Sequence, residues 1–279
     1  MKTDNHYTRY TSIKAQTKLL LQQWGQGLVS PTQSREDNPV HPRGDIWTTL
    51  PLKRSRSATA DGGYPLVYQS AFFPWLASVF PHPEGASFWE AQCLTLLPLW
   101  VERYSPNVTL EILPRHGFRI GISGEAIVTN LRQWLKTPRP TDSQSLAPLR
   151  QRLWSKTGEG CEIQYYHDRC QQLLQLAHRQ HWLPDPPPWA QLTWQSFQQG
   201  WHTDATRRSL LEAWSDHSDD LLYAPQRLIT GIPQFLHTLE QYDRAHSWGS
   251  LAQTLAPETF WGHAALIAAS DRVLEQVLR

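Results

Sequence analysis

The chain has 279 residues, 40% of them hydrophobic, which is enough for two modest domains or one large one with a real core. No run of 18 apolar residues is present, which excludes a membrane-spanning helix of the usual length, and the first residues contain no apolar stretch typical of a secretory signal. The three cysteines form no CxxC pair and cannot all pair with one another, so we expect a reduced, cytoplasmic protein.

The formal net charge of +1 hides an uneven distribution of charged residues. Residues 1–140 carry 15 Lys and Arg against 10 Asp and Glu. Residues 160–279 carry 8 Arg, no Lys and 13 Asp and Glu, a net charge of −5. A polyanion such as RNA should therefore prefer the N-terminal half of the chain.

Two amphipathic helices are predicted early in the chain, over residues 12–28 and 87–104, because apolar residues recur there at helical spacing. Pro98 is expected to kink or divide the second helix. The polar, basic stretch Lys53–Gly63 lies between the two helices. Its arginines either touch phosphate or belong to a solvated loop, and the solvated loop is the usual outcome.

A β-hairpin is predicted next, because apolar residues alternate over 108–113 and 118–122 on either side of a Pro-Arg-His-Gly turn. A helix follows over 127–135, with its N-cap region at Ser123. The stretch 141–159 is rich in Pro, Ser and Thr and is the predicted linker between two domains.

Residues 160–279 are predicted to be helical throughout, apart from a proline-rich loop over 181–194. Helices are expected over 204–214, over 233–242 with Pro233 in its first turn, and over 258–278. The most regular pattern is Glu162–Ala177, EIQYYHDRCQQLLQLA. Its apolar stripe comprises Ile163, Tyr166, His167, Cys170, Leu173, Leu174 and Ala177, while polar residues occupy the other side.

The segment Gln164-Tyr165-Tyr166-His167-Asp168-Arg169-Cys170 resembles the helix that opens the anticodon-binding (DALR) domain of arginyl-tRNA synthetases. That helix typically reads Gln-Tyr-Ala-His-Ala-Arg followed by an apolar residue. Gln164, Tyr165, His167 and Arg169 match it in register, whereas Tyr166 and Asp168 replace its two small residues.

Three further segments are similar to parts of the same family, in the family's order. Val108–Leu135 resembles the end of the N-terminal add-on domain of bacterial arginyl-tRNA synthetases, with residues 58–86 as an insertion upstream. His202–Leu211 and Ala264–Leu278 resemble a middle segment and the closing helix of the DALR domain. The resemblance implies an α+β add-on-like domain over 1–140, a linker over 141–159 and an all-α DALR-like bundle over 160–279.

The catalytic domain of that family has no counterpart in this chain. Only some 20 residues separate Leu135 from Gly160, too few for a β-α-β unit. The chain contains no His-x-Gly-His, no P-loop and no Gly-x-Gly-x-x-Gly motif. We therefore expect a protein that is not an enzyme and needs no cofactor. His178 and His181 lie at i, i+3 without a third ligand nearby in the sequence, so no metal site is expected.

The resemblance implies RNA contacts in two regions, the opening helix of the bundle and the hairpin. Packing is the alternative role for Tyr165 and His167, and a solvated turn is the alternative for the hairpin residues. The candidate RNA-binding residues are Gln164, Tyr165, His167, Arg169, Arg115, His116, Phe118 and Arg119.

Two functional hypotheses follow from these patterns. The first is a non-catalytic tRNA-binding protein derived from an arginyl-tRNA synthetase, with arginine tRNA as one candidate ligand. The second is a protein–protein interaction adaptor that kept the synthetase accessory fold and lost RNA binding. The net charge of −5 over residues 160–279 favours the second. An enzyme of another type ranks last, because the sequence contains no evident nucleophile–base pair or metal centre.

Overall fold

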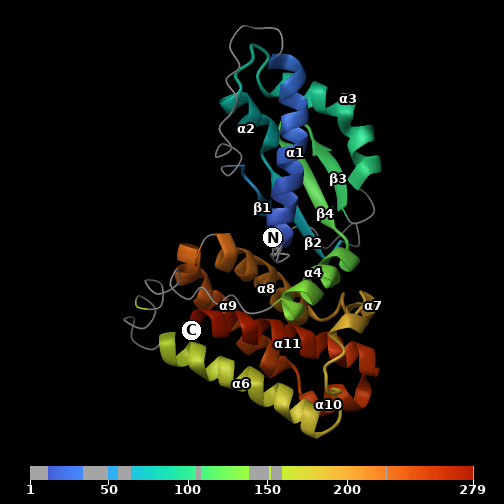
Figure 1. Cartoon of the computed structure of the whole chain (residues 1–279), viewed down its shortest axis with the longest axis vertical. Helices are drawn as coiled ribbons and strands as arrows, with labels where there is room; N and C mark the ends of the chain where they lie inside the picture. The colour runs from blue at the N-terminus through green and yellow to red at the C-terminus, as the bar shows by residue number, and fades with distance from the viewer. Residues whose placement is uncertain are drawn as a thin grey trace, which may run out of the picture. The chain divides into compact units, whose positions relative to one another are not determined.

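The computed structural model describes residues 12–33, 50–55, 64–104, 108–137, 151, 159–223 and 225–278. The chain divides into two compact units, one formed by Lys14–Ile127 and the other by Met1–Ile13 together with Val128–Arg279 (Figure 1). The first contains a small antiparallel sheet with helices, and the described part of the second is helical. The chain is therefore a mixed α+β protein with a helical region, as predicted. None of the described helices has the length and apolarity needed to cross a membrane.

The first unit is built around a four-stranded antiparallel sheet in the order β1-β2-β4-β3. The elements of the first unit are α1 (Ile13–Gln33), β1 (Lys53–Arg54), β2 (Leu66–Ser70), α2 (Phe72–Val79), α3 (Ala86–Tyr104), β3 (Val108–Leu113), β4 (Gly117–Ile122) and the start of α4 (Gly124–Lys136).

The core of this unit lies on one face of β4, where Phe118 is fully buried. The Phe118 ring centroid lies 5.9 Å from that of Trp24 in α1, and 5.1 and 5.3 Å from those of Phe72 and Phe73 in α2. Alternate residues of a strand share a face, so Ile120, which is also fully buried, extends the same core. Phe118, a candidate RNA-binding residue, is thus a core residue and is not available to stack on a base.

The predicted hairpin is confirmed as β3 and β4, joined by a tight turn. Arg115 in this turn has a positive φ of 62°, and its backbone N–H donates to a carboxylate oxygen of Glu90 at 2.9 Å. Gly117 follows with φ of 146°, a conformation that is essentially confined to glycine. A Cβ placed there would lie 2.1 Å from the backbone oxygen of Ser70, so the turn requires glycine at this position.

The helices α1 and α3 of the first unit follow the predicted pattern with two differences. α3 is continuous from Ala86 to Tyr104, so Pro98 does not divide it. α1 extends beyond the predicted end at Leu28 and finishes at Gln33.

The second unit packs its helices around α11, which is buried along most of its length (red in Figure 1). α11 contacts α6, α7, α8 and α10, and α8 packs along α9. Small residues such as Ala264 and Ala265 let neighbouring helices approach its axis closely. The elements are the second half of α4, α6 (Glu159–Arg179), η2 (Trp189–Gln191), α7 (Gln195–Gln198), α8 (Ala205–Tyr223), α9 (Pro225–Ala245), α10 (Trp248–Thr254) and α11 (Pro257–Leu278).

The division between the units falls inside α4, between Ile127 and Val128, whereas the sequence suggested residues 141–159. The physical reason is the attachment of the end of α4 to α11. Trp134 donates its indole N–H to the carbonyl of Ala269 at 3.3 Å, and Arg272 donates to the carbonyls of Trp134 and Thr137 at 2.6 and 3.0 Å. Most of the predicted linker lies outside the described residues.

The predicted start of a helix at Pro233 is wrong. α9 begins at Pro225, and Pro233 lies inside it. A proline is favoured in a first helical turn because it lacks an N–H, and Pro225 occupies that position here. The same lack of an N–H means that Pro233 cannot donate to the carbonyl one turn earlier in α9.

Candidate functional site

The face of α6 that the sequence predicted to be apolar packs inward. Ile163, Cys170, Leu173 and Ala177 are buried, which confirms the predicted stripe. Tyr165 lies outside the stripe and is 61% exposed, an unusual position for so large a ring. Of the candidate RNA-binding residues on this helix, Gln164 and Tyr165 are on the surface.

Two other candidates on α6 are held by carboxylates of neighbouring helices. Arg169 donates two hydrogen bonds to the carboxylate of Asp243 in α9, at 2.9 and 3.0 Å. Nδ1 of His167 lies 2.8 Å from Oδ1 of Asp271 in α11, and both side chains are largely buried. Arg169 and His167 therefore join α6 to its neighbours, and each already faces a carboxylate.

The remaining candidates lie in the other unit, on the hairpin. Arg115 and His116 are exposed in the turn. Arg119 pairs with Glu111 across the hairpin at 2.8 Å, and both side chains are partly solvated. A phosphate near Arg119 would therefore compete with an acidic neighbour.

A groove of about 470 Å³ lies between α6 and α9, beside Tyr165. Both helices contribute side chains to it, and each contributes one glutamate. Among the residues that the structure describes, neither a lysine nor an arginine lines it. The lining residues are Cys161, Glu162, Tyr165, Tyr166, Pro233, Leu236, His237 and Glu240.

The groove combines aromatic rings with negative charge. The rings of Tyr165 and Tyr166 meet edge to face, with centroids 5.0 Å apart. Burial, and then the negative charge of Glu240, raise the pKa of Tyr166, so the phenol stays protonated at neutral pH. Glu240 is paired at 2.5 Å with Arg244, whose side chain is 77% exposed. Such a surface is suited to a positively charged or hydrogen-bond-donating group.

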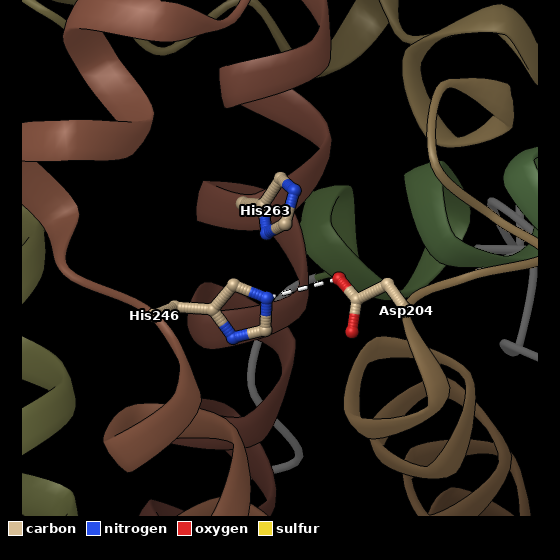
Figure 2. A group of neighbouring side chains, drawn as sticks. All are labelled: Asp204, His246 and His263. Carbon is tan, nitrogen blue, oxygen red and sulfur yellow. Dashed lines mark hydrogen bonds and ion pairs between the residues drawn. The ribbon is translucent and has the colours of Figure 1, made fainter.

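A second constellation lies within the helical unit, where Asp204, His246 and His263 come together (Figure 2). Nε2 of His246 lies 2.9 Å from Oδ2 of Asp204. Nε2 of His263 lies 3.0 Å from a guanidinium nitrogen of Arg207, and its Nδ1 lies 2.5 Å from the Tyr242 hydroxyl. Arg207 is 1% exposed and also donates to the carbonyl of Gln199 at 2.5 Å.

The partners of His246 favour its charged form. Its Nδ1 faces the carbonyl of Tyr242 at 2.8 Å and its Nε2 faces the carboxylate of Asp204, so both ring nitrogens meet acceptors. Burial opposes the charge, but the hydrogen bond to Asp204 and that to the Tyr242 carbonyl outweigh it, and the pKa of His246 is raised. Asp204 is desolvated as well, yet the hydrogen bonds from His246, the Arg207 backbone and Thr206 lower its pKa.

The partners of His263 favour its neutral form. Its Nε2 faces a donor on Arg207, so this nitrogen must carry the lone pair. Burial, and then the positive charges of Arg207 and His246, lower the pKa of His263 from 6.5 to about 3. Two histidines whose rings lie 5.3 Å apart are therefore held in opposite charge states by their surroundings.

This cluster has the residue types of a metal site, but its hydrogen bonds do not fit one. A metal ligand must offer a lone pair, whereas both nitrogens of His246 act as donors. The guanidinium of Arg207 already bonds Nε2 of His263 and lies 3.6 Å from Oδ2 of Asp204. A divalent cation would have to displace a buried positive charge. The cluster is therefore a buried hydrogen-bonded network that joins α8, α9 and α11.

We expect the helical unit to lose stability as the pH falls below about 6.5. The unfolded chain protonates His263 near 6.5 while the folded chain resists until about 3, so each pH unit between these values costs about 1.4 kcal/mol. The pKa of His246 is raised in the folded chain, so the stability that it contributes is fully present below pH 6.5 and is lost as the pH rises through its folded pKa. His246 therefore adds nothing to the pH dependence of stability between about pH 3 and 6.5. Unfolding in urea at pH 6.5 and pH 5 should differ by about 2 kcal/mol from His263 alone.

The control for this prediction is His263→Gln, which keeps an acceptor for Arg207 and does not titrate. The difference in pH dependence between the two proteins isolates the contribution of His263 from that of the carboxylates. An equal pH slope in the variant would contradict the charge state assigned to His263.

The sequence patterns gave almost no indication of the groove between α6 and α9 or of the cluster that contains His246 and His263. Tyr242 and His246 are spaced i, i+4, but the predicted helix ended at Tyr242, and Asp204 and His263 are distant in sequence. The acidic groove arises from the packing of α6 against α9, which no local pattern specifies.

Comparisons with known proteins yield no match: the chain matches no protein-family model, no curated protein and no solved structure.

Proposed function

We propose that the chain is a non-catalytic binding protein whose helical unit recognises a protein partner at the groove between α6 and α9. The observation that carries the proposal is the lining of this groove, where two glutamates and two tyrosines meet and none of the described lysines or arginines takes part. A groove that binds an anticodon loop needs positive charge to offset the phosphates. The carboxylates of Glu162 and Glu240 would repel them.

The candidate residues on α6 support the same choice. The positive charge of Arg169 is offset by Asp243, and His167 faces Asp271, so neither is set apart for a phosphate. The net charge of −5 over residues 160–279 also disfavours the approach of a phosphate, over longer distances. Tyrosines at the rim of a groove are typical of protein interfaces, where they supply contact area at a low entropic cost.

Site-specific crosslinking tests this proposal at the groove itself. Cys161 is exposed and lines the groove, whereas Cys93 and Cys170 are buried, so a maleimide-linked benzophenone should attach selectively at Cys161. We expect irradiation in cell extract to give adducts that resist ribonuclease and are removed by protease. The same labelled chain carrying Glu162→Gln and Glu240→Gln should lose these adducts.

Adducts that persist in the double variant would contradict recognition through the groove carboxylates. Adducts that ribonuclease removes would contradict the choice of a protein partner. A label at the same position therefore distinguishes the two classes of ligand.

The second candidate function is tRNA binding, which the resemblance to arginyl-tRNA synthetases implies. The specific observation in its favour is Tyr165, which matches the family's motif and is 61% exposed, since exposed aromatic rings are the groups on which unpaired bases stack. If tRNA binding resides there, Tyr165→Ala should weaken filter binding of total tRNA at low salt by roughly 1–3 kcal/mol, or about 5- to 150-fold. Absence of binding at low salt would remove this candidate.

A further inference from the structure

We infer that the groove between α6 and α9 binds an arginine side chain presented by a basic segment of a partner protein, an inference that rests on the proposed protein-binding function. Its two walls each supply a carboxylate, Glu162 from α6 and Glu240 from α9. A cation seated between the helices therefore faces a carboxylate on each side, of which Glu240 is already paired with Arg244. A carboxylate ligand or a phosphate in the same place would face repulsion from both.

The aromatic lining favours a guanidinium in particular. The rings of Tyr165 and Tyr166 meet edge to face at an interplanar angle of 81°, and Tyr165 is 61% exposed, so a planar cation can lie over the face of the Tyr165 ring. Arginine stacks on aromatic rings and binds carboxylates through two parallel hydrogen bonds. Lysine forms a compact, strongly hydrated point charge and gains less from the rings.

The chain itself contains an example of the proposed contact. Arg244 binds Glu240 through its guanidinium at 2.5 Å, one helical turn along α9. The Arg244 side chain is 77% exposed, and pairs of this kind contribute only about 0–1 kcal/mol. A partner's arginine can therefore exchange with Arg244 at little cost, and it gains the tyrosine rings and Glu162 in addition.

The test is a calorimetric titration of the full chain with a capped hexapeptide of alternating glycine and arginine at low ionic strength. We expect saturable binding that Glu162→Gln combined with Glu240→Gln weakens by about tenfold or more. Tyr165→Ala should weaken it as well, because the ring then no longer covers the guanidinium. The corresponding lysine peptide should bind more weakly, and the glutamate peptide should not bind.

The matched control is Glu258→Gln, which removes the same charge from an exposed position on α11 that does not line the groove. Equal weakening by this control would overturn the inference, because it would mean general attraction to an acidic surface. Equal affinity for the lysine peptide would overturn the preference for arginine.

The failures of the two proposals are distinguishable. If Cys161 crosslinks to a protein and the groove variants abolish the adduct, but the arginine peptide does not bind, the protein-binding function stands and the arginine inference falls. If the groove variants leave the Cys161 adduct unchanged, the proposed function falls as well.

Discussion

Replacing Arg207 with methionine should lower the free energy of unfolding of the helical unit by about 3–5 kcal/mol, the usual cost of removing one partner of a buried ionic network. The guanidinium is 1% exposed, bonds His263 and the carbonyl of Gln199, and lies 6.0 Å from the ring centroid of Trp201. Methionine fills much of the same volume but donates no hydrogen bond. The carbonyl of Gln199 and Nε2 of His263 would then be buried without their donor, which is the costly arrangement.

Urea unfolding followed by circular dichroism at a helical wavelength measures this change, because the described part of this unit is helical. The matched control is Arg244→Met, the same substitution at a side chain that is 77% exposed, which should cost about 0–1 kcal/mol. Equal effects of the two substitutions would contradict the structural role assigned to the buried network.

Replacing Gly117 with alanine should destabilise the sheet unit by about 3 kcal/mol or more, because strain and overpacking add at this position. Its φ of 146° is unfavourable for any residue with a Cβ, and that Cβ would lie 2.1 Å from the Ser70 backbone oxygen and 2.5 Å from the Phe72 backbone nitrogen. Backbone atoms cannot move aside as a flexible side chain would. The neighbouring Phe118 would shift with them and open the aromatic core.

Gly85→Ala is the control for this prediction. Gly85 also has a positive φ, 57°, but among the described residues, its chain neighbours aside, no heavy atom lies within 4 Å of the Cβ that alanine would add. We expect it to cost about 1 kcal/mol from backbone strain alone. Thermal unfolding of both variants separates strain from overpacking, and a Gly117→Ala cost no larger than that of Gly85→Ala would contradict the observed close approach.

Local patterns predicted much of the fold because the elements concerned are specified by their own residues. The apolar stripe of α6 and the alternation in β3 and β4 were recognisable from spacing alone. The division of the chain into units could not be recognised from spacing, because it depends on Trp134 bonding to Ala269, 135 residues later. Burial of Phe118 likewise depends on rings from α1 and α2, although strand alternation indicated that one face of β4 would be covered.

The candidate site was predictable in part. Helical periodicity placed Gln164 and Tyr165 outside the apolar stripe, and both are exposed. The same pattern gave no indication that Arg169 meets Asp243 or that His167 meets Asp271, since each pair joins helices distant in sequence. These two carboxylates change what the motif can do, because they already occupy the two side chains that a phosphate would need.

The most direct test of the groove as a site for a basic partner is fluorine NMR of a small trifluoromethyl tag on Cys161, recorded while the full chain is titrated in parallel with the arginine peptide and with total tRNA. The account predicts that the peptide shifts the tag's resonance to a saturable endpoint, that tRNA at the same ionic strength leaves it in place, and that Glu162→Gln with Glu240→Gln abolishes the shift. A shift produced by tRNA and not by the peptide would contradict it.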